Sequence, residues 1–204
     1  MLNNMKIMRY KNFIITGAAS GLGKSLAQKL LADGKNVIGI DQDKIEINAD
    51  NLSGNLKTIL FDLKDYEKVN QLFDINEIQK IDCLINCAGY ETAGFVDDLP
   101  LKEITRNFNV NTMAPIALTK FLLPIFKKNK GCVVNVISAM ATIGVPGRLA
   151  YCMSKSALQM FSNVTRAEFK YFGIKVTTIY PEVMATPFWD RVAYYGRIQA
   201  AEMN

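Results

Sequence analysis

The hydrophobic positions of this chain fall into short apolar runs that alternate with longer amphipathic stretches. The apolar runs predict β-strands at residues 13–15, 36–41, 58–62, 81–86, 131–138 and 175–180. Helical spacing predicts helices at about 22–31, 66–75, 99–128 and 149–172. Strands that are apolar throughout and alternate with helices are typical of a parallel sheet covered on both faces. The pattern therefore predicts an α/β fold, a doubly wound parallel sheet, in a single domain over residues 1–204.

A glycine-rich turn directly follows the first predicted strand. Gly17, Gly21 and Gly23 have the spacing G-x-x-x-G-x-G between that strand and the next helix. Glycines let the backbone come close to a phosphate group, and a helix N-terminus offers free N–H donors. A plain tight turn is the alternative, but the position between strand and helix favours a phosphate-binding turn.

An acidic residue, Asp41, ends the second predicted strand. It lies about 20 residues beyond the glycine turn, where a carboxylate can bind the hydroxyl groups of an adenosine ribose. A carboxylate at this position would repel a 2′-phosphate, so the position favours NAD as the cofactor over NADP. The alternative is an ordinary acidic residue in the turn at a strand end.

The composition excludes several classes of function. Histidine is absent from the sequence, which excludes Ser-His-Asp hydrolysis, Cys-His proteolysis and histidine metal sites, and we expect no metal. The net charge is +5, but lysine and arginine are scattered, so we expect no nucleic-acid partner. The N-terminus lacks the apolar segment of a signal peptide, and no apolar run is long enough to span a bilayer. We therefore expect a cytoplasmic protein with no membrane partner.

The candidate catalytic pair is Tyr151 and Lys155. Residues four apart in a helix share a face, so the phenol and the ammonium would lie side by side. A free tyrosine has a pKa near ~10, and a fixed positive charge favours the phenolate. The pair therefore predicts a tyrosine base whose pKa is lowered by the lysine. The alternative is a solvated helix face on which this spacing occurs by chance.

Together these motifs resemble the short-chain dehydrogenase/reductase family, whose members are single-domain oxidoreductases with a Rossmann-type sheet. The resemblance covers about residues 12–190. Residues 86–89, Asn-Cys-Ala-Gly, resemble the family's N-A-G segment, and Asp62 matches the acid that holds the adenine ring. Thr186, after Pro181, matches the threonine that contacts the nicotinamide carboxamide. The cofactor site that the resemblance implies consists of Gly17, Ser20, Gly21, Leu22, Gly23, Asp41, Asp62, Leu63, Asn86, Ala88, Gly89, Tyr151, Lys155, Pro181 and Thr186.

The resemblance also implies a catalytic tetrad. Tyr151 would be the general acid/base, and Lys155 would lower its pKa and hold the nicotinamide ribose. Ser138 would hydrogen-bond the substrate oxygen and stabilise its developing charge. Asn111 would hold a water molecule that links Lys155 to solvent. The expected reaction is hydride transfer between NAD(H) and a secondary alcohol or ketone.

Two features depart from the family pattern. Glu182 follows Pro181 where the family usually has glycine, and the sequence stops at Asn204, before the family's seventh, edge strand. We expect a flexible lead-in at residues 1–11 and a substrate-side segment at residues 182–204. We also expect a homo-oligomer, and a dimer through the helices at 100–128 and 149–172 in preference to a tetramer.

The sequence gives only a coarse prediction of the substrate. Mostly apolar candidates suggest an alcohol or ketone with an apolar body, although ordinary core or lid packing is the favoured explanation for each of them taken alone. Two other functions stay open: an epimerase or dehydratase that uses bound NAD on the same fold, and a non-catalytic NAD-binding sensor or partner protein. The candidate pocket residues are Tyr90, Met140, Val145, Met184, Phe188 and Trp189.

Overall fold

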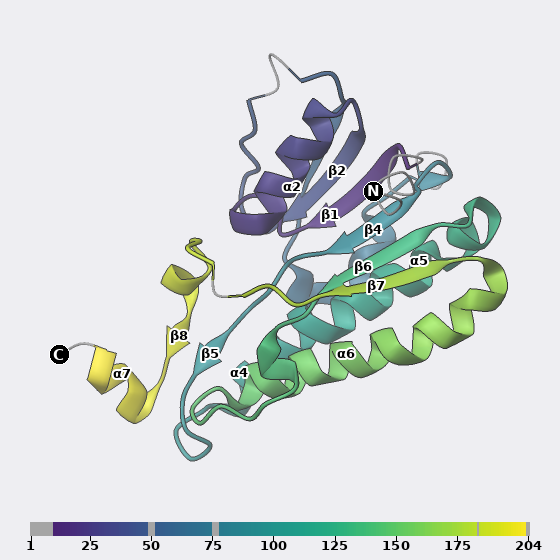
Figure 1. Cartoon of the computed structure of the whole chain (residues 1–204). Helices are drawn as coiled ribbons and strands as arrows, with labels where there is room; N and C mark the ends of the chain where they lie inside the picture. Colours follow the sequence, from purple (N-terminus) through teal and green to yellow (C-terminus); the bar gives the residue numbers. More distant parts are fainter. Residues whose placement is uncertain (1–9, 49–51, 75–77, 183, 203–204) are drawn as a thin grey trace.

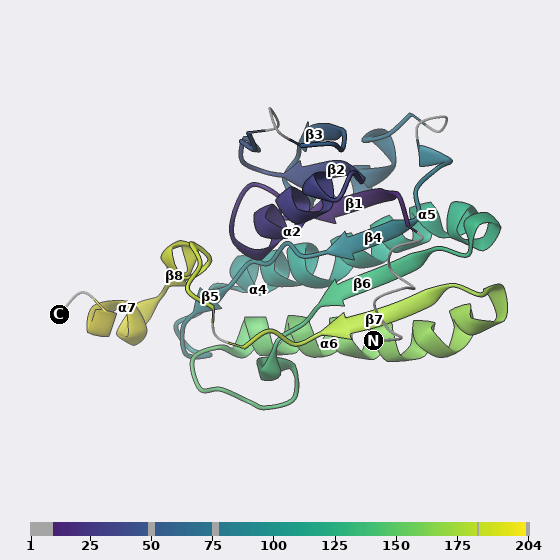
Figure 2. The ribbon, with the colours of Figure 1, turned by 45° about the horizontal axis from the view of Figure 1, so that its top comes forward.

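The computed structural model describes residues 10–48, 52–74, 78–182 and 184–202. Within these ranges the main sheet has six strands, all parallel, in the order β3-β2-β1-β4-β6-β7. The order reverses at β1 and β4, which is the arrangement of a Rossmann-type doubly wound sheet. Figure 1 shows the strands with their carboxyl ends on one side, and Figure 2 shows the strand order from top to bottom. The strands are β1 (Asn12–Thr16), β2 (Asn36–Asp41), β3 (Leu56–Leu60), β4 (Cys83–Asn86), β6 (Cys132–Val136) and β7 (Lys175–Ile179).

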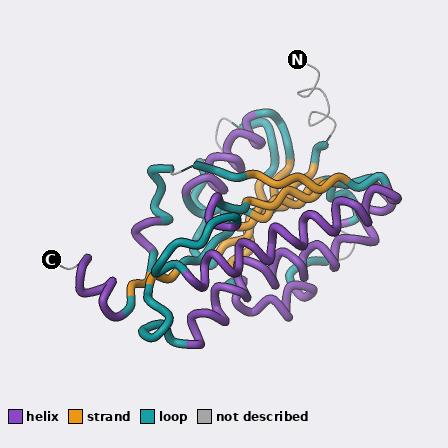
Figure 3. The backbone as a smooth tube through the Cα atoms, turned by 60° about the horizontal axis from the view of Figure 1, so that its bottom comes forward, coloured by secondary structure: helices purple, strands orange, loops and turns teal. Residues whose placement is uncertain are grey.

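Helices cover both faces of the sheet, as the sequence predicts. Helix α2 (Gly21–Ala32) packs on one face, and α4 (Leu101–Phe108), α5 (Ala114–Asn129) and α6 (Leu149–Phe169) lie along the other (Figure 3). Successive strand residues point to opposite faces, so neighbouring side chains of β1 enter different cores. Phe13 packs with the buried residues of α2, whereas Ile14 packs with those of α5. The central strands β1 and β4 are buried on both faces, whereas the edge strands β3 and β7 are more exposed and carry polar residues.

The helical regions differ in detail from the prediction. The helix expected at about 66–75 is a 3₁₀ segment, η1 (Leu63–Gln71), and residues 75–77 lie outside the described ranges. The long helix expected at 99–128 is interrupted by a π-helical stretch, η2 (Asn109–Met113). Pro115 lies in the first turn of α5, where a missing N–H costs little, and Pro124 lies inside α5. The break therefore precedes Pro115, and the helix continues past Pro124.

The structure also contains a second, two-stranded parallel sheet that the sequence does not predict. It pairs β5 (Thr92–Ala93) with β8 (Ala193–Tyr194), and helix α7 (Gly196–Glu202) follows. Strands of two residues are too short to show a period in the sequence. Short 3₁₀ segments complete the fold: η3 (Ala139–Ala141), η4 (Lys170–Phe172) and η5 (Trp189–Arg191). In the part of the chain that the structure describes, no helix combines the length and the apolar character that crossing a bilayer requires.

Candidate active site

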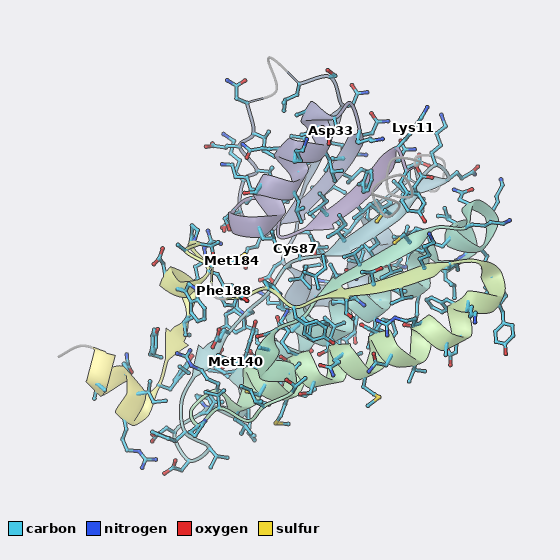
Figure 4. The ribbon with its side chains drawn as sticks, viewed as in Figure 1. Lys11, Asp33, Cys87, Met140, Met184 and Phe188 are labelled. Atoms are coloured by element: carbon cyan, nitrogen blue, oxygen red, sulfur yellow. The ribbon has the colours of Figure 1, made fainter. Side chains whose placement is uncertain are left out.

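A cavity of about 760 Å³ lies at the carboxyl ends of the strands. Parallel sheets of this topology bind ligands at this edge, where the strand order reverses. Figure 4 shows Cys87, Met140, Met184 and Phe188 on this side of the molecule, and Lys11 and Asp33 away from it. Among the residues expected to bind the cofactor or act in catalysis, those that line the cavity are Gly17, Ser20, Gly21, Leu22, Gly23, Asp41, Asp62, Leu63, Ala88, Gly89, Ser138, Tyr151, Lys155, Pro181 and Thr186.

The glycine turn forms one wall of this cavity. Gly17 has a φ of +74°, and a Cβ atom there would lie 2.8 Å from the Cα atom of Ala88. A Cβ atom on Gly23 would lie 2.1 Å from the carbonyl oxygen of Gly17. Side chains are therefore excluded at both positions, and the backbone at the start of α2 stays open toward the cavity. This is the cradle that a dinucleotide phosphate requires, with helix N–H donors beside it.

Asp41 is held in place by backbone N–H groups at the end of β2. Its two carboxylate oxygens accept hydrogen bonds from the N–H groups of Ala19 (2.8 Å) and Asp43 (3.1 Å). Each carboxylate oxygen has two acceptor positions, so both oxygens can still accept from ribose hydroxyls. Asp43 forms an ion pair with Arg191 of η5, which joins this wall to the segment after β7. The Asp41 and Asp43 carboxylates therefore line this end of the cavity together with the Arg191 guanidinium.

Asp62 caps the first turn of η1 at the same end of the cavity. Its carboxylate accepts from the Lys64 N–H (3.0 Å) and pairs with the Lys64 ammonium (2.9 Å). Arg106, which sequence reasoning missed, places its guanidinium 3.9 Å from Asp62 and 4.5 Å from the centre of the Tyr90 ring. Burial raises the pKa of the Asp62 carboxyl, but the Lys64 hydrogen bonds and the two positive charges outweigh it and lower the pKa. Asp62 is therefore an ionised acceptor.

Tyr151 and Ser138 meet at the other end of the cavity. Tyr151 lies in the first turn of α6, and Ser138 precedes η3. Burial, and then the negative charge of Glu91, raise the pKa of the Tyr151 phenol well above its ordinary value, although a hydrogen bond with Ser138 opposes the rise. The direction is opposite to the lowered pKa that the sequence predicts, because burial and the charge of Glu91 raise it. The phenol is protonated at neutral pH.

Lys155 lies one turn after Tyr151 and is 3% exposed. Its ammonium donates a hydrogen bond of 2.9 Å to the Val136 carbonyl and lies 5.7 Å from the centre of the Tyr151 ring. Burial lowers the pKa of Lys155 to about 8, against the opposing influence of Cys87 and Glu91. A buried ammonium next to the phenol is the arrangement that the helical spacing predicts.

Two expected site residues do not line the cavity. Asn86 is buried within the sheet, and its amide donates to the Asn135 side chain (2.7 Å). The Asn111 amide donates to the Tyr90 carbonyl (2.7 Å) and the Ser154 hydroxyl (2.9 Å), and its oxygen accepts from the Tyr90 N–H (2.8 Å). Both amide protons of Asn111 are used, so its side chain fixes the loop after β4 and has no donor left for water.

Five of the six candidate substrate-pocket residues line the cavity, and Val145 does not. Val145 lies instead along a separate groove formed with Ile143 and Pro146, because the loop after η3 turns away from the cavity. Glu182 does line the cavity, where the family pattern has glycine. Sequence reasoning also missed Glu91, which lines the cavity and is the charged residue two positions after the N-A-G segment. A charged residue so close to the N-A-G segment was the feature of the sequence that could have identified Glu91 as a site residue.

Comparison with known proteins agrees with this geometry. A sequence model of the short chain dehydrogenase family matches residues 11–194. A "Dehydrogenase/reductase SDR family member 7B" from Xenopus laevis is 35% identical over 187 residues, covering 85% of this chain and 58% of its own length. The chain spans between 58% and 68% of the length of three such curated relatives.

Solved structures give the same result. A "4-hydroxyisoleucine dehydrogenase complexed with NADH" superposes with a TM-score of 0.78 at 31% identity, over 86% of this chain and 77% of its own. A short-chain dehydrogenase from Sphingobium yanoikuyae in complex with NADPH shares the fold, with a TM-score of 0.80 at 23% identity over 95% of this chain and 82% of its own. Proteins of this fold are thus described with NADH and with NADPH. The chain belongs to the short-chain dehydrogenase/reductase family of oxidoreductases.

Proposed function

We propose that this chain binds NAD(H) and transfers hydride between it and a secondary alcohol or ketone. The observation that carries the proposal is the convergence of Tyr151, Ser138 and Lys155 on one cavity with the glycine turn and Asp41. The bound nicotinamide would accept or donate the hydride. The residues of the chain would position both reactants and move the proton.

We call the end of the cavity with Ser138, Tyr151 and Lys155 the catalytic end, and each of these residues would have a separate role. Ser138 donates a hydrogen bond to the substrate oxygen and stabilises the negative charge that forms there during reduction. Tyr151, protonated at neutral pH because burial raises its pKa, gives its proton to that oxygen. The Lys155 ammonium stabilises the phenolate that remains and hydrogen-bonds the ribose. In the oxidation direction, the same groups take the proton back.

We propose NAD in preference to NADP because the Asp41 carboxylate lines the cavity at the end of β2, where the adenosine ribose would bind. The 2′-phosphate of NADP would bring further negative charge beside this carboxylate. One structural neighbour is described with NADH and another with NADPH, so the fold itself accepts either cofactor. Asp41 is the residue of this chain that supports the choice, since Asp43 is paired with Arg191.

The segment at 182–204 would cover the substrate, in one domain with the rest of the chain. Met184, Phe188 and Trp189 from this segment line the cavity, and the Phe188 ring centre lies 6.1 Å from that of Tyr151. An apolar lid beside the catalytic phenol supports a substrate with an apolar body. The substrate itself is proposed only as an alcohol or ketone of this kind.

We also propose a homodimer. Apolar side chains on the outer faces of α4 and α6 are exposed in the single chain, including Leu101, Met153, Met160 and Val164. Exposed apolar side chains that gather on helices are typical of a protein–protein interface. Light scattering at micromolar concentration should give twice the monomer mass, and a monomer would contradict the dimer.

The proposed function is tested by cofactor titration followed by turnover. NADH and NADPH are titrated separately into the protein and followed by fluorescence, and NADH oxidation is then measured with a panel of aryl alkyl ketones. We expect tighter binding of NADH and ketone-dependent NADH oxidation. Tighter NADPH binding would overturn the cofactor choice alone. Binding of NADH without turnover on any ketone would favour an NAD-binding sensor over an oxidoreductase.

A further inference from the structure

One buried carboxylate in the cavity has no role in the proposed chemistry. Glu91 lies between the N-A-G segment and β5, is 2% exposed and lines the cavity with Tyr151 and Ser138. One of its oxygens, Oε1, accepts a hydrogen bond of 2.8 Å from Arg148. Its other oxygen, Oε2, is buried and has no hydrogen-bond partner among the described residues.

An unpartnered carboxylate oxygen is unfavourable in a protein interior. Buried polar atoms are nearly always hydrogen-bonded, and leaving one unpaired costs its full desolvation. Burial raises the pKa of the Glu91 carboxyl although Arg148 opposes the rise, so the charged form lacks part of the stabilisation that it has in water. A hydrogen-bond donor placed at Oε2 would supply that stabilisation.

The second buried glutamate of this region shows what a purely structural role looks like. Glu103 on α4 accepts a hydrogen bond of 2.7 Å from the Tyr90 hydroxyl and another from Tyr195. It does not line the cavity. Glu103 thus joins elements of the fold through protein donors, whereas Glu91 keeps an oxygen without a protein donor in the wall of the site.

The position of Glu91 relative to the catalytic end limits what could bind to it. Its partner Arg148 is the N-cap residue of α6, three residues before Tyr151 in the sequence. The charge of Glu91 acts on both Tyr151 and Lys155. Because Glu91, Tyr151 and Ser138 line one cavity, a molecule whose carbonyl binds at Tyr151 and Ser138 would share that cavity with Glu91.

We propose that Glu91, oriented by Arg148, binds a hydrogen-bond donor of the substrate, a hydroxyl or ammonium group near the reacting carbonyl. This inference rests on the proposed function, because it assumes that the carbonyl binds at Tyr151 and Ser138. It narrows the substrate class from apolar ketones to ketones that carry a donor close to the carbonyl. Glu91 would be a specificity-determining residue, separate from the proton transfer.

The test uses two matched sets of phenyl ketones that differ in one group. The first set is 2-hydroxyacetophenone, 2-aminoacetophenone and propiophenone, which place a hydroxyl, an ammonium or a methyl group on the carbon next to the carbonyl. The second set, 3-hydroxypropiophenone, 3-aminopropiophenone and butyrophenone, moves the same groups one carbon further. Dissociation constants are measured by titration calorimetry with and without saturating NAD⁺, and kcat/KM is measured with NADH.

In at least one set we expect the wild-type protein to bind a donor-bearing ketone about tenfold or more tightly than its methyl counterpart, since hydrogen bonds to charged groups are among the stronger ones. Preference for the amine or for the alcohol identifies the donor. Glu91→Gln should reduce the preference to about twofold or less, and Glu91→Asp should retain part of it. Glu103→Gln, a change at a buried glutamate outside the cavity wall, should leave the preference unchanged.

The inference would be overturned by no preference in the wild-type protein, by no binding of any ketone, or by an equal loss of affinity for all ketones in Glu91→Gln. The wild-type measurement decides the matter even if a variant fails to fold. Equal turnover of all six ketones would overturn this inference and leave the proposed function intact. Preferential binding without any turnover would support the inference and count against the proposed function.

Discussion

The two ends of the cavity, one with acidic residues near the glycine turn and one with Tyr151 and Lys155, differ in how the protein treats their ionisable side chains. At the ribose end, Asp41 and Asp62 are held by backbone N–H groups, and Asp43 pairs with Arg191 across the opening. At the catalytic end, Tyr151 and Lys155 are buried, and burial is the largest influence on the pKa of each. We therefore expect the proposed ribose end to select the cofactor by its hydrogen-bonded carboxylates. At the proposed catalytic end, burial disfavours the charged forms of Tyr151 and Lys155.

The largest effect is expected at the catalytic end, from Tyr151→Phe. Removing the hydroxyl removes the proton donor, so NADH-linked ketone reduction should fall about 1,000-fold or more. The dissociation constant for NADH, measured by fluorescence, should stay within about twofold, because that interaction belongs mainly to the other end. Tyr171→Phe, at a tyrosine that is 92% exposed, is the control and should retain full activity. A fully active Tyr151→Phe would remove the phenol from the mechanism.

A smaller, selective effect is expected at the ribose end, from Asp41→Asn. Asparagine keeps the shape and can still accept from the backbone, but it loses the charge. The ratio of NADPH to NADH affinity should rise about tenfold, since the repulsion of a 2′-phosphate is reduced. Asp33→Asn changes an exposed acid away from the cavity and should leave the ratio unchanged. An unchanged ratio in Asp41→Asn would show that another group selects the cofactor.

Replacing Lys155 by methionine should show that the buried ammonium lowers the free energy of unfolding. The pKa of Lys155 is about 8 in the folded protein, below its ordinary 10.5, so folding disfavours the charged form. The cost is fully present below pH 8 and is relieved as the pH rises from 8 toward 10.5. Wild-type stability should therefore rise relative to Lys155→Met by about 2 kcal/mol between pH 7 and pH 9.5, measured by urea unfolding.

In that comparison, the variant should be the more stable protein at pH 7 although it loses activity. Stability profiles that run parallel across this pH range would mean that Lys155 has an ordinary pKa. The catalytic end would then resemble the ribose end, and the contrast between them would fail.

The smallest effect is expected for the ion pair between Asp43 and Arg191. Both side chains are 48% exposed, and exposed pairs contribute about 0–1 kcal/mol. Asp43→Asn and Arg191→Met should each change NADH affinity by about threefold or less, and a double-mutant cycle should give a coupling within that range. A coupling several times larger would mean that this pair holds the cavity closed over the cofactor.

Much of the fold could be predicted from the sequence because its signals are local. Each buried strand is a continuous apolar run, and the glycine turn lies within one strand–helix unit. The pairing of Tyr151 with Lys155 needs only helical spacing, which a single element supplies. The sequence predicts all six strands of the main sheet. It does not predict β5 and β8, because strands of two residues are too short to show an alternation of apolar and polar positions.

The features that the sequence did not predict depend on distant segments meeting. The raised pKa of Tyr151 comes from burial by several elements and from Glu91, 60 positions earlier in the numbering of the chain. Both amide protons of Asn111, in the π-helical stretch, are donated to Tyr90 and Ser154, which lie 21 and 43 positions away in the sequence. Val145 faces another groove because its loop turns outward. The spacing of residues within a helix or strand does not predict such contacts between distant segments.

The most direct test of the proposed hydride transfer uses NADH that carries deuterium at its transferable position. The protein is incubated with this cofactor and a phenyl ketone, and the alcohol product is examined by mass spectrometry. We predict one deuterium on the carbinol carbon with the wild-type protein and almost no labelled alcohol with Tyr151→Phe. Tight binding of NADH with no labelled alcohol from any ketone would contradict the assignment of this chain as a hydride-transferring oxidoreductase.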